Sequence, residues 1–157
     1  MGGTEPLVIE TNEGQLRIRG IVDRLDTRDG EVRVIDYKIG SSHLSAGDLI
    51  HGRRLQLPLY ALAAERALDL GEVVDGFYWA ILAARRGSLR LANFQDTDAD
   101  DGLSGPAAAY QRLNSHLERF LAGGRQGAFP PVPPAGGCPT YCPAADWCWR
   151  YSPGYRG

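Results

Sequence analysis

Two aspartates and a lysine stand at spacings that favour metal-dependent chemistry. Asp36 and Lys38 are two residues apart, and Asp23 precedes them across an Asp-Gly pair. Asp-Gly supplies the positive φ angles of a two-residue type I′ hairpin loop, and Val, Ile and Leu flank it here at strand spacing. We therefore predict that residues 20–38 form two antiparallel strands that carry all three side chains.

The hairpin turn decides which side chains share a face. With Asp29 and Gly30 as the loop, Asp23 is expected opposite Asp36, and Lys38 follows on the same face. The two carboxylate-bearing Cβ atoms are then on the order of 5 Å apart. The remaining side chains of this face are apolar, namely Ile21, Leu25, Val32 and Val34.

Two carboxylates in an apolar surface need a counter-charge, because facing like charges destabilise a sheet and burial raises the cost. Lys38 supplies one positive charge, whereas a divalent cation supplies two and accepts oxygen from both Asp23 and Asp36, as in Mg²⁺ sites. The alternative is an exposed hairpin whose charges point to water, since another turn would shift the register and reverse the faces. The expected register also places Arg33 opposite Asp26 as a cross-strand ion pair.

These residues resemble the signature of a known nuclease superfamily. Asp23 followed by Asp36, Tyr37 and Lys38 is similar to the split Asp…(Asp/Glu)-x-Lys pattern of the PD-(D/E)XK, or restriction-endonuclease-like, nucleases. More narrowly, three blocks in order resemble the RecB-like exonuclease domains, including those of AddB-type helicase–nuclease subunits. The blocks are Gly20-x-x-Asp23-Arg24-x-Asp26, Asp36-Tyr37-Lys38 and Gln56-x-x-x-Tyr60.

The resemblance implies an α/β fold, with a restriction-endonuclease-like mixed β-sheet flanked by helices. It also implies a metal-dependent DNA nuclease, of the single-stranded DNA exonuclease type, that hydrolyses phosphodiester bonds in DNA repair or recombination. Asp23 and Asp36 would bind Mg²⁺ or Mn²⁺ together with the backbone carbonyl of Tyr37. Lys38 would orient the attacking water and stabilise charge on the phosphate. The implied partners are a single-stranded DNA end and a helicase or other recombination subunit.

A helix predicted over residues 55–70 would bring a second group of side chains to this site. Gln56 and Tyr60 are four residues apart and project from one side of that helix. Taken alone, they read as a polar residue and a half-buried tyrosine at a helix start. The resemblance instead implies that they lie beside the metal and contact the nucleic acid strand. Arg53 and Arg54 just upstream are candidates for holding phosphates, or are solvated surface charge.

Further strands and helices are predicted around the hairpin from hydrophobic periodicity and turn residues. A capping box from Ser45 to Asp48 opens a short helix before Gly52. Strands are expected at residues 7–10, 15–25, 73–85 and 89–94, and a last helix at residues 106–122. Three histidines are expected at the surface: His43, His51 and His116.

A cysteine-containing tail follows the predicted nuclease core. We assign residues 1–127 to the core and residues 128–157 to a Pro-rich connector and an irregular tail that packs on it. The tail holds Cys138, Cys142 and Cys148, and thiolates this close together need a cation, so metal or cluster ligation is their natural use.

RecB-like relatives with a 4Fe–4S cluster place three cysteines in this region and take the fourth from an upstream helical segment. That segment also carries an acidic or histidine residue of the site, so the chain is expected to lack the N-terminal part of the family domain. The outcome for the cysteines stays open between an empty site, a partial disulfide, zinc with another fourth ligand, and a cluster completed from outside this chain.

Composition sets the remaining expectations. A chain of 157 residues with 43% hydrophobic and 23% charged residues suits one soluble domain that can bury a core. The net charge of −2 gives no global attraction to nucleic acid, so any basic footprint is local. No apolar run reaches the length of a membrane span, and we expect a cytoplasmic protein.

Two other functions stay open. The first is a catalytically weak DNA-binding or scaffold module, or a fragment of a helicase–nuclease subunit, because the upstream acidic ligand is missing. Glu10 is the nearest carboxylate that could replace it. The second is a small metal-binding interaction domain built on the cysteine tail, which leaves the aspartates and Lys38 unexplained.

Overall fold

The computed structural model describes residues 5–40, 45–99, 102–128, Cys142 and Cys148. The chain divides into two compact units, Met1–Ala122 and Gly123–Gly157. All of the strands in the described part of the chain lie in the first unit. The predicted boundary between residues 127 and 128 stays a prediction, as does the packing of the tail.

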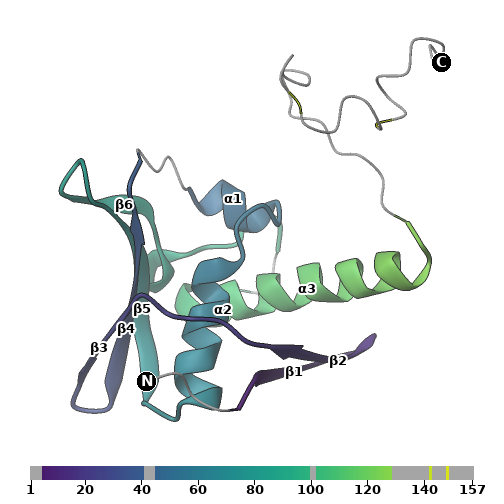
Figure 1. Cartoon of the computed structure of the whole chain (residues 1–157), viewed down its shortest axis with the longest axis horizontal. Helices are drawn as coiled ribbons and strands as arrows, with labels where there is room; N and C mark the ends of the chain where they lie inside the picture. The colour runs from purple at the N-terminus through teal and green to yellow at the C-terminus, as the bar shows by residue number, and fades with distance from the viewer. Residues whose placement is uncertain (1–4, 41–44, 100–101, 129–141, 143–147, 149–157) are drawn as a thin grey trace. The chain divides into compact units, whose positions relative to one another are not determined.

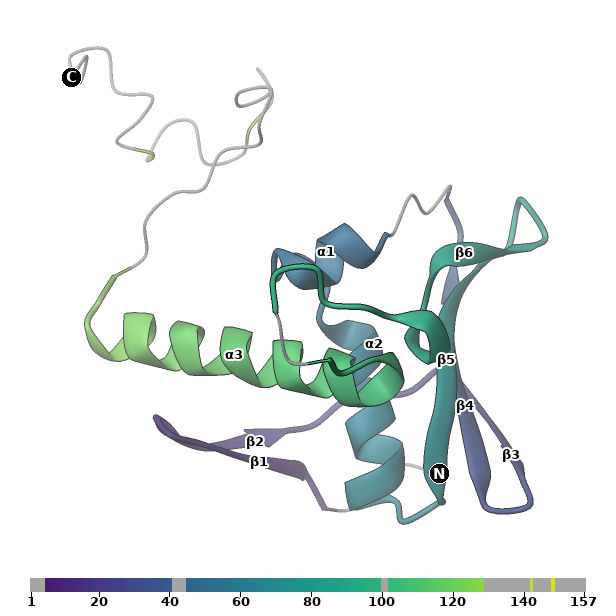
Figure 2. The ribbon, with the colours of Figure 1, turned by 180° about the vertical axis from the view of Figure 1, so that it is seen from behind.

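A mixed four-stranded sheet with the order β3-β4-β5-β6 forms the centre of the first unit (Figure 1). Strand β4 runs antiparallel to β3 and parallel to β5, and β6 returns antiparallel to β5. Helices α1, α2 and α3 lie on one side of this sheet in both views (Figure 2). The predicted class, a restriction-endonuclease-like mixed sheet with helices beside it, is confirmed. The strands are β3 Arg24–Arg28, β4 Glu31–Lys38, β5 Glu72–Ala80 and β6 Arg85–Arg90.

The β3–β4 hairpin has the predicted turn and register. Asp29 and Gly30 both have positive φ angles, 53° and 82°, as a type I′ turn requires. Asp26 lies opposite Arg33, but the predicted ion pair between them is wrong. The Asp26 carboxylate is instead 2.7 Å from Nε of Arg24, because residues two apart on one strand share a face and Arg24 can reach along it.

The crossover between β4 and β5 is helical, as a parallel strand pair needs. Helix α1 (Ala46–Ile50) begins at the predicted capping box, where Ser45 is the N-cap. Helix α2 (Gln56–Leu62) tolerates Pro58 in its first turn and continues as the π-helical turn η1 (Ala63–Ala67). The predicted helix over residues 55–70 is thus present, with a π-bulge in its second half.

The predicted strand over residues 15–25 is wrong. The chain forms β2 (Gly14–Ile18), which pairs only with β1 (Leu7–Thr11) in a separate two-stranded sheet. It then crosses through residues 19–23 before β3 begins. The reason is packing: the small sheet buries Leu7 and Ile9 against α2 and α3, and one straight strand could not pair with both β1 and β4.

The C-terminal half of the first unit differs from expectation at its turns. Strand β6 begins at Arg85, earlier than the predicted residue 89, because the chain already turns after Ala80 and Ala84 adopts a φ of 47°. Helix α3 (Gly105–Arg125) continues past the two glycines expected to end it. A short 3₁₀ turn, η2 (Leu91–Asn93), lies between these elements. No helix in the described part of the chain is long and apolar enough to cross a membrane.

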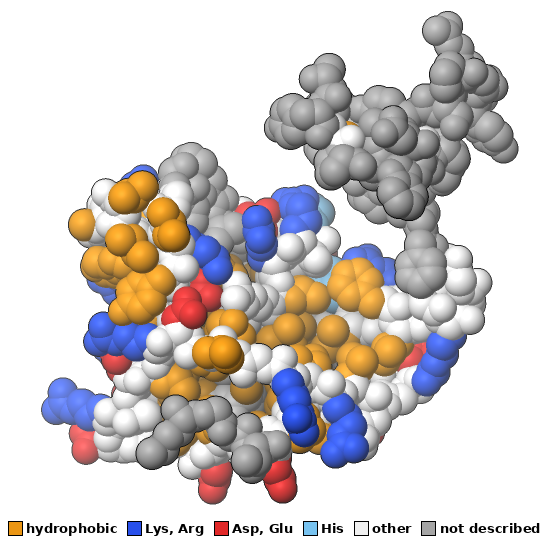
Figure 3. Space-filling view, in the orientation of Figure 1, with side chains coloured by type: hydrophobic (Ala, Val, Ile, Leu, Met, Phe, Trp, Pro, Cys, Tyr) orange, Lys and Arg blue, Asp and Glu red, His pale blue; other side chains and the backbone are white. Residues whose placement is uncertain are grey.

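The turn between β5 and β6 leaves aliphatic side chains in solvent. Ile81 and Leu82 are 49% and 79% exposed, and Ile39 beyond the end of β4 is 74% exposed. The backbone N–H of Ile81 donates to the carbonyl of Lys38, so the ends of the two strands are tied together. Figure 3 shows apolar side chains gathered at this end of the sheet, with Lys and Arg side chains beside them.

His116 is buried, so its predicted place at the surface is wrong. It is 2% exposed, and its Nε2 atom lies 3.0 Å from the carbonyl oxygens of both Leu49 and Ile50. These carbonyls lie at the C-terminal end of α1, where helices leave acceptors unpaired, and the imidazole of α3 bonds both of them, although the Leu49 carbonyl also accepts from the backbone N–H of Gly52. Burial is the main cause that lowers the pKa of His116, and Arg119 and Arg112 add to it.

Lowering the pH should destabilise the folded protein through His116. In the unfolded chain the imidazole protonates with a pKa of about 6.5, whereas the folded environment lowers that pKa. Its contribution is therefore complete above about pH 6.5 and is lost progressively as the pH falls below that value. Thermal unfolding between pH 7.5 and pH 5 should show a smaller loss of Tm in His116→Gln, which keeps a side-chain N–H donor, than in the wild type.

The exposed His51 provides the matched control. His51→Gln should keep the pH dependence of the wild type, because its side chain lies in solvent. Equal slopes in all three proteins would show that His116 does not govern the acid sensitivity.

Candidate active site

The two aspartates meet at the end of the β3–β4 hairpin. Asp23 comes just before β3, and its Oδ2 atom accepts a 2.9 Å hydrogen bond from the backbone N–H of Tyr37. Asp36 lies on β4 and is only 1% exposed. Burial is the main cause that raises the pKa of Asp36, Asp23 raises it further, and Lys38 opposes both. The structure thus places one buried and one exposed carboxylate side by side.

Lys38 joins the aspartates to helix α2. Its Nζ atom forms an ion pair with Asp36 and donates a 3.0 Å hydrogen bond to Oε1 of Gln56. Nε2 of Gln56 in turn donates to Oη of Tyr60 over 2.7 Å. The ammonium also lies 5.3 Å from the ring centroid of Tyr78, on the neighbouring strand. An unbroken series of contacts therefore runs from the buried carboxylate to the tyrosine hydroxyl.

The aspartate pair fits a divalent cation. Oδ2 of Asp36 is buried and, although it belongs to the ion pair with Lys38, accepts no well-aligned hydrogen bond in the described structure. Carboxylate oxygens of this kind are the donors that Mg²⁺ and Mn²⁺ take, with water or substrate filling the other positions. The described residues contain no group of three or more His, Cys, Asp or Glu that could hold a metal ion.

Some predicted site residues lie elsewhere or stay untested. Glu10 is on β1, where its carboxylate accepts a 2.7 Å hydrogen bond from Gln15, and the structure does not bring it to the aspartates. Arg53 is exposed and pairs with Asp48 over 3.0 Å, a surface pair that contributes little to stability. Arg54 is also exposed. The metal-binding role of the Tyr37 carbonyl remains a prediction.

The cysteine prediction falls mostly on residues that the structure does not describe. Cys138 lies outside the described residues, whereas Cys142 and Cys148 are free thiols that are partly exposed. The question of what the three thiols bind stays open.

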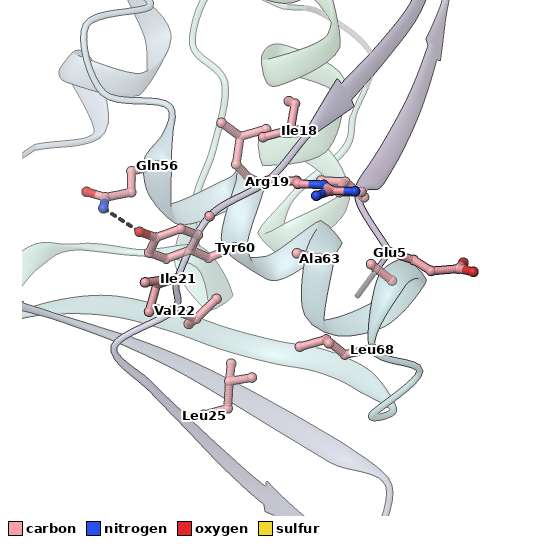
Figure 4. A pocket seen from close by; sticks show the side chains of 14 residues that line it. Glu5, Ile18, Arg19, Ile21, Val22, Leu25, Gln56, Tyr60, Ala63 and Leu68 are labelled. Carbon is pink, nitrogen blue, oxygen red and sulfur yellow. Dashed lines mark hydrogen bonds between the residues drawn. The ribbon is translucent and has the colours of Figure 1, made fainter. Parts of the chain in front are cut away.

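A hollow beside the site was not predicted from the sequence. It has a volume of about 750 Å³ and lies between residues 18–25 and one face of α2 and η1 (Figure 4). Gln56 and Tyr60 line it at one end, so it adjoins the series of contacts described above. No local sequence pattern predicts this hollow, because it forms only where the chain passes from the β1–β2 sheet to the four-stranded sheet.

A mixed sheet with helices beside it is the fold of the PD-(D/E)XK nucleases. The chain belongs to the PD-(D/E)XK nuclease superfamily, which it matches over residues 2–149. Within this superfamily it is similar to proteins named as a subunit of an ATP-dependent helicase/deoxyribonuclease, of the AddB type that the sequence resemblance implied.

Three of these relatives show the extent of the similarity. The protein of Symbiobacterium thermophilum is 45% identical over 69 residues, which cover 40% of this chain and 6% of that protein. The protein of Leuconostoc citreum is 34% identical over 51% of this chain and 7% of its own length. That of Carboxydothermus hydrogenoformans is 29% identical over 73% of this chain and 12% of its own length. The chain therefore matches only a small part of each relative.

Divalent metal should stabilise the folded chain through the two aspartates. At a concentration about ten times the Kd, mass action contributes about 1.4 kcal/mol, which raises Tm by roughly 3–6 °C. Asp23→Asn should lose most of this rise on addition of Mn²⁺, because the amide keeps an acceptor for Tyr37 but removes the charge. Differential scanning fluorimetry with and without chelator measures the shift.

Asp29→Asn is the matched control for this experiment. Asp29 belongs to the same hairpin and is exposed, and asparagine tolerates its positive φ. Its Mn²⁺-induced shift should equal that of the wild type. A shift that survives unchanged in Asp23→Asn would place the metal elsewhere.

Proposed function

We propose that this chain is a divalent-metal-dependent DNA nuclease domain that hydrolyses phosphodiester bonds. The observation that carries the proposal is the buried Asp36 carboxylate, set between Asp23 and the ammonium of Lys38. Such a cluster costs folding free energy, because burial and the neighbouring charge both disfavour ionised Asp36, and costly clusters of this kind are typical of functional sites. Membership of a nuclease superfamily supplies the class of reaction.

The residues divide the work between holding a cation and handling the phosphate. Asp23 and Asp36 would hold Mg²⁺ or Mn²⁺, which when bound polarises the phosphate and lowers the pKa of water. Lys38 donates hydrogen bonds toward the attacking water and the phosphate oxygens, where negative charge develops. Gln56 fixes the ammonium from the α2 side, so that Lys38 is held between two acceptors before substrate arrives.

The substrate that we propose is a single-stranded DNA end, handled by Gln56 and Tyr60, with Arg53 and Arg54 near the phosphates. Arg54 is exposed beside α2, and Arg53, which pairs with Asp48, would have to exchange that partner for a phosphate to add to a local basic footprint on a chain of net charge −2. The relatives are named as helicase/deoxyribonuclease subunits, which favours a role in DNA repair or recombination with a helicase as partner. A weakly cutting DNA-binding module is the second candidate, since no third acidic ligand joins the aspartates among the described residues.

Cleavage of labelled single-stranded DNA should depend on Lys38. With Mg²⁺ or Mn²⁺ present, Lys38→Ala should cut at least about 100-fold more slowly, because the substitution removes the group that stabilises charge in the transition state. Chelator should abolish cutting by the wild type. Gel analysis of product lengths over time gives the rate and distinguishes removal of terminal nucleotides from internal cuts.

Arg33→Ala is the matched control, because Arg33 is an exposed cation on the same strand. It should cut at about the rate of the wild type. Equal rates in Lys38→Ala and the wild type would remove the proposed site. DNA binding without cutting in any of the three proteins would favour the binding module.

We further propose that Cys138, Cys142 and Cys148 bind a metal ion or complete an iron–sulfur cluster with a ligand from outside this chain. Three thiolates within eleven residues favour a soft cation. Elemental analysis of protein purified without oxygen should find iron or zinc, and Cys142→Ser should carry clearly less of it. Ser115→Ala, on α3, is the control. If the wild-type protein contains neither iron nor zinc, the proposal that the three cysteines bind metal is wrong.

A further inference from the structure

The hollow beside the candidate site has the size and lining of a ligand pocket. Its volume of about 750 Å³ lies within the range of roughly 300–1,000 Å³ that is usual for small-molecule pockets. Aliphatic side chains from several strands, the crossing segment and the α2–η1 helix make most of its wall, and few polar groups join them. The aliphatic residues that Figure 4 labels are Ile18, Ile21, Val22, Leu25, Ala63 and Leu68.

The hollow is continuous with the series of contacts at the candidate site. Gln56 lines the hollow and also accepts the hydrogen bond from Lys38, while the ring of Tyr60 forms part of the wall and its hydroxyl accepts from Gln56 (Figure 4). A molecule with a phosphate beside Lys38 could therefore reach the hollow past Gln56 with a group attached next to that phosphate.

The charges at the hollow indicate how such a molecule lies. Arg19 offers a cation at the wall, and Glu5 places a carboxylate at the far side from Tyr60 (Figure 4). A second phosphate is therefore favoured near Arg19 and disfavoured near Glu5. The aliphatic side chains of the wall suit the flat, weakly polar face of an aromatic ring.

We propose that the hollow receives an unpaired nucleobase of the DNA strand whose phosphate lies at Lys38; this inference rests on the proposed nuclease function. Stacking against apolar walls and the Tyr60 ring accepts every base, because each has a π-face. The small number of polar groups gives no pattern that would read base identity. A base in a duplex must leave its stack to enter such a pocket, so the hollow selects single strands.

The test compares two oligonucleotides that differ only in their bases. Binding of a fluorescent oligothymidylate of about 12 nucleotides is measured by anisotropy in chelator, where no cutting occurs, beside the same strand with abasic sugars at its terminal nucleotides. The wild type should bind the strand with bases roughly tenfold more tightly. Ile21→Ser, at the rim, should reduce this ratio, as should Ala63→Leu, which fills part of the hollow.

Leu82→Ser is the matched control. Ile21 and Leu82 are 83% and 79% exposed, so neither substitution removes a buried contact, and Leu82 lies in the β5–β6 turn away from the hollow. Its ratio of affinities should equal that of the wild type. Circular dichroism confirms that each variant is folded.

Each outcome decides one proposal. Equal affinity for the two strands, with cutting that still depends on Lys38, would overturn the base pocket and leave the nuclease proposal intact. If the ratio of the two affinities changes in neither Ile21→Ser nor Ala63→Leu, the base pocket is also overturned. The hollow would then bind something else, such as a protein segment. Base-dependent binding without any metal-dependent cutting would support the pocket and remove the nuclease function.

Discussion

The ion pair between Asp36 and Lys38 is the interaction on which the rest of the site depends. A carboxylate that is 1% exposed and adjacent to Asp23 is held charged only if a cation is close. Lys38 supplies that cation from the same strand and is itself tied to Gln56 on α2. Because the Lys38 ammonium has two acceptors, removing either one should change its position. A metal ion bound to Oδ2 of Asp36 would compete with the ammonium for that oxygen.

Strand β4 can carry this pair because it is an interior strand of the sheet. Its neighbours β3 and β5 fix its backbone on both sides, and its helix-facing side chains change from Val32 and Val34 to Asp36 and Lys38 along its length. The aliphatic half anchors the strand in the core, where both valines are fully buried. The polar half, Asp36 and Lys38, is therefore held at a fixed position next to the start of α2.

The hairpin and the contents of its polar face were predictable from sequence, because an Asp-Gly turn sets register locally. Gln56 was also predictable as a partner on a helix, although its bond to Lys38 was not. Two of the wrong predictions share another cause. The strand over residues 15–25 and the surface position of His116 both depended on which distant segments pack together. Hydrophobic periodicity and turn residues are local signals, so they do not show which distant segments pack together.

The break between β2 and β3 shows how such a departure can serve function. An uninterrupted strand would have alternated Ile21 and Val22 between two faces and left no room beside Tyr60. Instead the crossing segment leaves Ile21 83% exposed at the rim of a hollow that reaches Gln56. Asp36 is fixed on the regular strand β4, whereas Asp23 ends the irregular segment, which also leaves space next to the aspartates. The proposed site, which would hold a cation and admit a DNA strand, therefore combines both kinds of backbone.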